Sequence, residues 1–144
     1  MRITTRGRYA LRASLALAKH GKNGPVSINC LAEEESISSI FLEQIFFRLR
    51  KAGIVSSTRG PGGGFCFTQS LDQLTVKQIL DAAGEVIELT FCDKHEENCD
   101  RIGECMSHFI WIEAHELLQK YFSEITLASI IEKYGKKNIP QKNQ

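Results

Sequence analysis

Cysteine and histidine side chains are concentrated in one short part of this 144-residue sequence. Cys92, Cys99 and Cys105 are separated by six and then by five residues, and His108 follows three positions after the last of them. Thiolates and imidazoles bind soft metal ions and iron–sulfur clusters. The residues between the cysteines are mostly charged or small and cannot build a hydrophobic core, so a shared ligand would order them. The spacing therefore predicts a metal or iron–sulfur site.

Two kinds of site fit these ligands. Zinc ligands are commonly paired about two to four residues apart, and only Cys105 and His108 are that close. The wider gaps favour a loop that wraps an iron–sulfur cluster, while a Cys3His zinc site remains an alternative. Three unliganded thiols are disfavoured because an exposed acidic loop would leave them open to oxidation. His95 is a spare ligand candidate, and we expect Cys30 and Cys66 to be small core residues.

Charge divides the chain into a basic and an acidic half. Residues 1–70 contain ten Lys and Arg against four Asp and Glu, whereas residues 71–144 contain eight against thirteen. This asymmetry favours a polyanion as the partner of the first half. No apolar run reaches the roughly 20 residues of a membrane-spanning helix, and the N-terminus has no apolar signal core. We therefore expect a cytoplasmic protein without membrane association, whose cysteines stay reduced.

Helical periodicity predicts three helices in the basic half, over about residues 6–19, 28–35 and 38–51. The third carries polar and basic residues opposite its apolar stripe. A tight connection between the second and third helices gives a helix-turn-helix pattern, although an ordinary α-hairpin has the same periodicity. The first helix is expected to face the core with Leu11, Leu15 and Ala18.

A β-hairpin is predicted directly after the third helix. Residues 54–58 and 65–68 have strand composition and enclose a glycine-rich turn that begins at Arg59 and Gly60. A hairpin in this position is the wing of a winged helix, and an arginine at its tip suits a narrow minor groove of DNA. A nucleotide-binding phosphate loop is excluded because its glycines would precede a Lys-Ser/Thr pair and a helix.

The third helix would then enter the major groove of DNA. Polar side chains near its start could hydrogen-bond bases or phosphates, and its basic residues could contact the backbone. Glu43 could accept a hydrogen bond from a cytosine amino group, or could reject wrong sites by repulsion. The candidate DNA-binding residues are Ser38, Ser39, Glu43, Gln44, Arg48, Arg50, Lys51, Arg59 and Gly60.

The acidic half is predicted to begin with a helix over residues 74–83, since Thr75 and Gln78 match a capping box. A long helix over residues 107–124 has apolar residues on two faces, which favours a two-fold homodimer. Thr126 would cap a last helix that ends near Tyr134. The expected fold is mainly α-helical with a small β-hairpin wing. Its expected parts are a DNA-binding domain (1–72), the ligand loop with dimerisation helices (73–134) and a flexible tail (135–144).

Three segments together resemble the IscR-type iron–sulfur cluster regulators, a family of winged-helix transcriptional regulators. They are MRITTRGRYALR, FLEQIFFRLRKAGIVSSTRGPGGGF and the Cys…Cys…CMSH run, and the resemblance covers residues 1 to about 134. It implies a dimer that binds operator DNA and adjusts transcription of cluster-assembly genes. It also implies that Cys92, Cys99, Cys105 and His108 hold a [2Fe-2S] cluster.

One spacing departs from the family pattern, because the family usually has five residues between the first two cysteines and this chain has six. A nitric-oxide-sensing branch of the family uses an acidic residue near the N-terminus, where Arg8 and Arg12 stand here. A zinc-stabilised or metal-free repressor that answers to another signal remains the alternative. An enzyme is not expected, since no nucleophile motif accompanies the cysteines.

Overall fold

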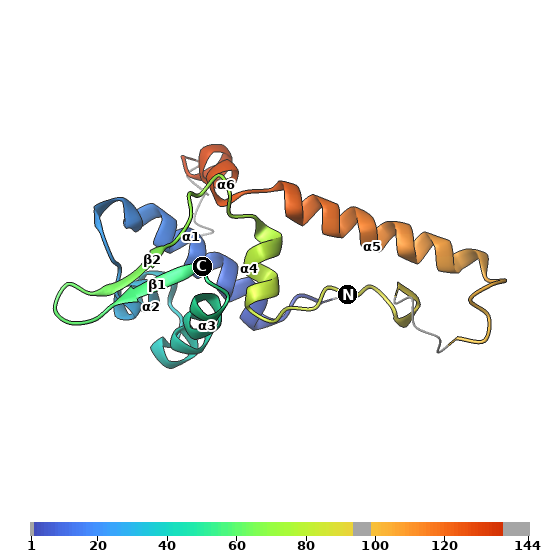
Figure 1. Ribbon diagram of the computed structural model, residues 1–144, viewed down its shortest axis with the longest axis horizontal. Helices are drawn as coiled ribbons and strands as arrows, with labels where there is room; N and C mark the ends of the chain where they lie inside the picture. The colour runs from blue at the N-terminus through green and yellow to red at the C-terminus, as the bar shows by residue number, and fades with distance from the viewer. Residues whose placement is uncertain (1, 94–98, 137–144) are drawn as a thin grey trace, which may run out of the picture.

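The computed structural model describes residues 2–93 and 99–136, so His95 and residues 137–144 lie outside the described residues. Within them the fold is mainly helical with a two-stranded antiparallel hairpin, as the sequence predicted (Figure 1). The elements are α1 (Thr5–His20), η1 (Gly21–Asn23), α2 (Ile28–Glu35), α3 (Ser39–Lys51), β1 (Val55–Thr58), β2 (Gly64–Phe67), α4 (Val76–Ala82), η2 (Phe91–Asp93), α5 (Met106–Glu124) and α6 (Leu127–Tyr134).

Hydroxyl side chains fix where five of these helices begin. In each case the oxygen of the residue before the helix accepts a hydrogen bond from a backbone N–H of the first turn, which satisfies a donor that has no partner inside the helix. α4 and α6 also have complete capping boxes, formed with Gln78 and Ser129. The five capping residues are Thr4, Ser27, Ser38, Thr75 and Thr126.

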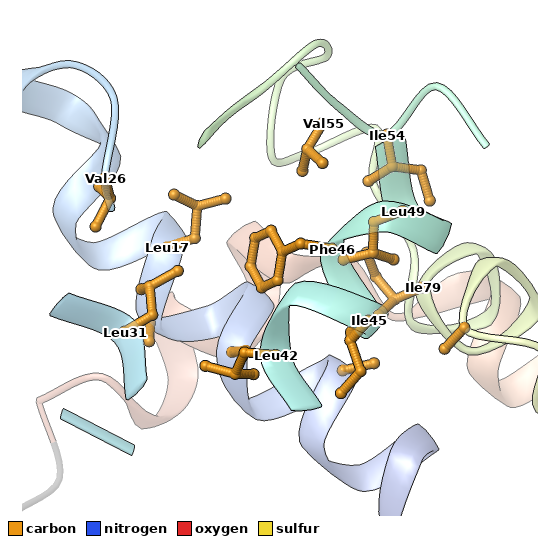
Figure 2. Close-up of a cluster of buried hydrophobic side chains, with 14 of the residues drawn as sticks. Leu17, Val26, Leu31, Leu42, Ile45, Phe46, Leu49, Ile54, Val55 and Ile79 are labelled. Atoms are coloured by element: carbon orange, nitrogen blue, oxygen red, sulfur yellow. The ribbon is translucent and has the colours of Figure 1, made fainter. Parts of the chain in front are cut away.

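The main core lies between α1, α2 and α3 and extends to the hairpin and α4 (Figure 2). Phe46 from α3 is fully buried and contacts Phe65 of the hairpin, with ring centroids 5.0 Å apart. α1 contacts α2, α3, α4 and α6, so its fully buried residues include Ala10, Ala13 and Leu17. Leu11 and Leu15, predicted to face the core, do pack against it, although they are only half-buried. Small alanines let the neighbouring helices approach.

The wing is tied to the segment that precedes α2. β1 and β2 pair from Val55 opposite Phe67 to Thr58 opposite Gly64. Val26 and Phe65 exchange backbone hydrogen bonds of 3.0 and 2.8 Å. Gly64 is required here, since its φ is +153° and a Cβ would lie 2.3 Å from the backbone of Val26. The base of the wing is thereby fixed, while its tip extends away from the body (Figure 1).

α4 and α6 begin side by side. Thr75 and Thr126, their capping residues, form an antiparallel bridge. The Val76 N–H donates to Ile125 O, and the Leu127 N–H donates to Leu74 O, both at 2.9 Å. Two helix starts far apart in the sequence are thus joined by backbone hydrogen bonds.

α5 packs on the winged-helix body at one end only. Its last turns pack through Leu118 and Phe122 against a small cluster of Val76, Leu80 and Ile87. Its first turns extend away from the winged-helix body as a long arm (Figure 1). In the described part of the chain, no helix combines the length and apolar character needed to cross a membrane.

Candidate functional site

The outward face of α3 carries the candidate DNA-binding residues of this helix. Glu43, Gln44 and Arg48 are exposed, as are Arg50 and Lys51. They are exposed because the opposite stripe of α3 is fully buried in the main core. Ser38 is exposed and Ser39 is half-buried, which places both hydroxyls at the start of the helix. Ser38 Oγ already accepts from the Phe41 N–H at 3.5 Å, so its hydroxyl hydrogen and its second lone pair stay available.

Arg50 connects α3 to the wing. Its Nη1 donates to Ser57 Oγ of β1 at 3.2 Å, and its guanidinium lies 5.8 Å from the centroid of the Phe47 ring. The hydrogen bond helps to set the angle between the helix and the hairpin. Arg59 and Gly60 lie beyond β1 and are exposed at the tip. Gly60 has a φ of +92°, a conformation that glycine adopts without steric cost.

A depression of about 650 Å³, which we call the α3 depression, lies on this face. Its lining combines residues that the sequence predicted to bind DNA with residues that the sequence analysis did not single out. The helical period could have placed Ile40 beside Glu43 and Gln44, but no sequence signal places Arg6 there, because Arg6 comes from α1. The lining residues include Arg6, Ile40, Glu43, Gln44, Phe47 and Arg48.

The start of α1 is held by the segment that leads to the cysteine loop. Glu85 is buried and accepts hydrogen bonds from the Thr4 N–H at 3.0 Å and from the Thr4 hydroxyl. Arg6 Nη2 donates to Gly84 O at 3.0 Å. Arg6 thus contacts both the residues before the cysteine loop and the α3 depression. This arginine links the α3 depression to the segment that follows α4.

Three of the four candidate metal ligands, Cys92, Cys105 and His108, lie in or beside α5. η2 carries Cys92 and contacts α5, whose first turn carries His108. Cys105 is the residue immediately before α5 and is half-buried. His108 is 7% exposed, and its backbone N–H donates to Cys105 O at 3.2 Å. Cys92 and Cys99 are exposed.

Cys105 has the chemistry of an accessible ligand. The hydrogen bond with the Ser107 hydroxyl, at 3.1 Å, and the nearby backbone N–H of His108 lower the pKa of the Cys105 thiol below its usual range. A lower pKa favours the thiolate, which is the form that binds metals. Sulfur and imidazole donors suit iron–sulfur clusters and zinc. Within residues 2–93 and 99–136, however, no three Cys, His, Asp or Glu side chains are gathered as a metal site.

Cys30 corrects one expectation from the sequence. It was expected in the core but is exposed on α2, because this helix turns Leu31 and Ala32 inward instead. Cys66 on β2 is half-buried. Neither lies in the segment that carries the candidate ligands.

A helix-turn-helix followed by a wing, with polar and basic side chains along the second helix of the pair, defines a winged-helix DNA-binding protein. The model of the Rrf2 family, described as an iron-dependent transcriptional regulator, matches residues 3–133. The chain belongs to the Rrf2 family. It is a transcriptional regulator and not an enzyme, as the sequence predicted.

Individual relatives agree with the resemblance to IscR-type regulators. The chain is 38% identical to the HTH-type transcriptional regulator IscR of Erwinia tasmaniensis, over 91% of this chain and 79% of that protein. The solved structure of T. potens IscR matches with a TM-score of 0.74 and 27% identity, covering 92% of this chain and 88% of that one. CymR, the global cysteine regulator of B. subtilis, matches with a TM-score of 0.78 and 27% identity, covering 92% and 98%.

Proposed function

We propose that this chain is a homodimeric transcriptional regulator whose DNA binding responds to an iron–sulfur cluster, and that it controls cluster-assembly genes. The observation that carries the proposal is the position of the ligand candidates. Cys105 and His108 lie at the start of α5, and η2 with Cys92 contacts the same helix. Three thiols and an imidazole are a donor set that suits such a cluster. The similarity to IscR and the iron-dependent description of the family agree with it.

The proposed ligands are Cys92, Cys99, Cys105 and His108, and the proposed group is a [2Fe-2S] cluster. When bound, such a group supplies coordination bonds that join separate chain segments and a redox-active centre. The hydrogen bond with Ser107 lowers the pKa of the Cys105 thiol, which makes the thiolate that would bind metal easier to form. His108 is buried in the first turn of α5.

The proposed DNA contacts divide by chemistry. Ser38, Ser39, Glu43 and Gln44 would approach base edges in the major groove, because residues near the start of a recognition helix come closest to them. Arg48, Arg50 and Lys51 would meet phosphates, and Arg59 with Gly60 would enter the minor groove. The segment from Gly84 to Glu85 contacts the start of α1, which gives the cysteine loop a route to this surface.

The homodimer is proposed from α5. Away from the face that packs on α4, this helix exposes large apolar side chains, which a second copy of the helix would cover. Their exposed fractions are 57% for Phe109, 59% for Ile110, 68% for Leu117 and 59% for Tyr121.

The experiment that tests the cluster is an absorption spectrum with iron, sulfide and zinc analysis on anaerobically purified protein. Equal iron and sulfide with visible absorption is expected, and Cys92→Ala or His108→Ala should lose both. Cys30→Ala is the matched control, since this thiol is exposed but lies on α2. A spectrum that survives Cys92→Ala, or a colourless protein, contradicts the proposal.

A second candidate is a regulator whose loop holds zinc or no metal and which answers to another signal. It is favoured by the described residues, which gather no three-ligand site, and by the likeness to CymR, named as a cysteine regulator. Stoichiometric zinc without sulfide in the same analysis would support it.

A further inference from the structure

Two large apolar side chains stand exposed on the outward row of α3. Ile40 is 69% exposed and Phe47 is 57% exposed. They lie at i and i+7 with Glu43 and Gln44 between them, so all four share one face of the helix. All four also line the α3 depression. A single exposed apolar residue needs no explanation. Two exposed apolar residues on either side of Glu43 and Gln44, which are proposed to contact bases, do need one.

The surroundings of this row indicate what covers it. Arg6, Arg48 and Lys51 line the same depression. Three cations around apolar side chains fit a partner that has negative charge at its edges and an apolar group in its centre. Duplex DNA has this pattern in the major groove, where phosphates flank the base edges and the thymine 5-methyl group is the apolar feature. An apolar protein partner would leave these cations without counter-charge.

We propose that Ile40 is a specificity-determining residue that packs against a thymine 5-methyl group in the major groove, beside the bases that Glu43 and Gln44 approach. The inference rests on the proposed DNA-reading function of α3. Ile40 is the second residue of α3, at the end of a recognition helix that lies closest to base edges. Phe47 lies about 10 Å further along the helix, beneath the guanidinium of Arg50. Ile40 is therefore the apolar side chain placed for base reading.

Removal of the methyl group alone tests this packing. Duplexes bound by the full-length protein are first selected from a random library. Each thymine of the selected sequence is then replaced, one at a time, by deoxyuridine, which keeps every hydrogen-bonding group and lacks only the methyl. At one thymine per half-site, the affinity of the unaltered protein should fall by about three- to tenfold, the effect expected when one buried methyl group is removed.

Variants assign the effect to Ile40. Ile40→Ala should bind the thymine duplex more weakly than the unaltered protein and should no longer distinguish thymine from uracil at that position. Val86→Ala is the matched control, because Val86 is an aliphatic residue that is 71% exposed and lies after α4. It should keep the full discrimination.

Two results overturn the inference while the DNA-reading function stands: uracil tolerated at every position, or unchanged discrimination in Ile40→Ala. A library that yields no enriched sequence contradicts the proposed function itself, and the inference falls with it. That failure appears at the selection step, before any uracil is introduced.

Discussion

Glu85 is one of the few polar or charged side chains that the described part of the chain buries. A buried carboxylate needs hydrogen-bond donors, and Thr4 supplies two of them. Thr4 also caps α1, so one carboxylate positions the residue that starts the first helix. Gly7 lies in the first turn of α1, and a Cβ there would be 2.5 Å from Glu85 Oε2. The space around this carboxylate is therefore filled.

Gly7→Ala is expected to destabilise the protein, although alanine usually stabilises a helix interior relative to glycine. The added methyl displaces Glu85 and weakens the cap, at a cost of about 1–3 kcal/mol. Denaturant unfolding measures the change. Gly21→Ala is the control, since a Cβ there meets nothing within 4 Å and its φ is −67°. Equal unfolding midpoints for the two variants would contradict this role of Gly7.

The thiol of Cys105 is expected to respond to pH differently from an ordinary thiol. The hydrogen bond with Ser107 is the largest influence that lowers its pKa. Thiolate therefore forms at lower pH, and alkylation of Cys105 in metal-free protein should begin at lower pH than alkylation of the thiol of a free cysteine peptide. In Ser107→Ala the pKa should rise and the alkylation profile should move to higher pH. Mass spectrometry of alkylated peptides across pH checks this, and an unmoved profile would refute it.

Residue-level predictions from the sequence succeeded where the cause is local. Capping by Thr75 and Gln78 follows from residues three positions apart, and it is confirmed. The exposure of Cys30 and the arrival of Arg6 beside α3 depend on how helices pack, which periodicity within one helix does not contain. The ligand set stays a prediction, because residues 94–98 lie outside the described residues and no three ligands gather within the described ones.

At the scale of elements, the two ends of α5 differ in what they pack against. Leu118 and Phe122 near its C-terminal end pack on the small cluster that α4 and Ile87 form. The sequence predicted two apolar faces on this helix, and the structure uses one of them for this packing. The exposed apolar residues of the other face are not covered by the described part of the chain. The two-fold dimer, which was predicted because α5 has a second apolar face, stays a proposal.

Leu117→Glu should weaken the proposed dimer, because a side chain that is 68% exposed in one chain would place a charge in the apolar interface. Sedimentation should show a shift toward monomer. The fold should be unaffected, since Leu117 is outside both described cores. Ile40→Glu places the same charge on an exposed apolar residue of α3 and should leave the oligomeric state unchanged. If the Leu117→Glu variant remains a dimer, the dimer interface does not include Leu117 and lies elsewhere.

At the scale of the whole molecule, the net charge of +1 conceals two halves of opposite sign. The basic half contains α1 to α3 and the wing, and the acidic half contains α4 to α6. A molecule with this distribution is attracted to DNA through one half and turns the other away. The salt dependence of DNA binding should therefore come from cations of the first half.

Arg59→Ala should weaken DNA binding and reduce the slope of log affinity against log salt by about one, because a cation in the minor groove also displaces one counterion from the DNA. Lys120→Ala, a change of an exposed cation on α5, should leave the slope unchanged. Fluorescence anisotropy titrations at several salt concentrations measure both variants. If the salt slope of Arg59→Ala equals that of the unaltered protein, the wing tip does not contact DNA.

The paired starts of α4 and α6 determine how tolerant the molecule is to changes in length. Thr75 and Thr126 are held together by backbone hydrogen bonds, and α4, which follows Thr75, packs on α1. The chain is fixed to the body again at Glu85, which accepts hydrogen bonds from Thr4, and near the end of α5, where Leu118 and Phe122 pack. An additional residue between Cys92 and Cys99 falls between these two attachments, so it leaves the register of α1, α3 and the wing unchanged.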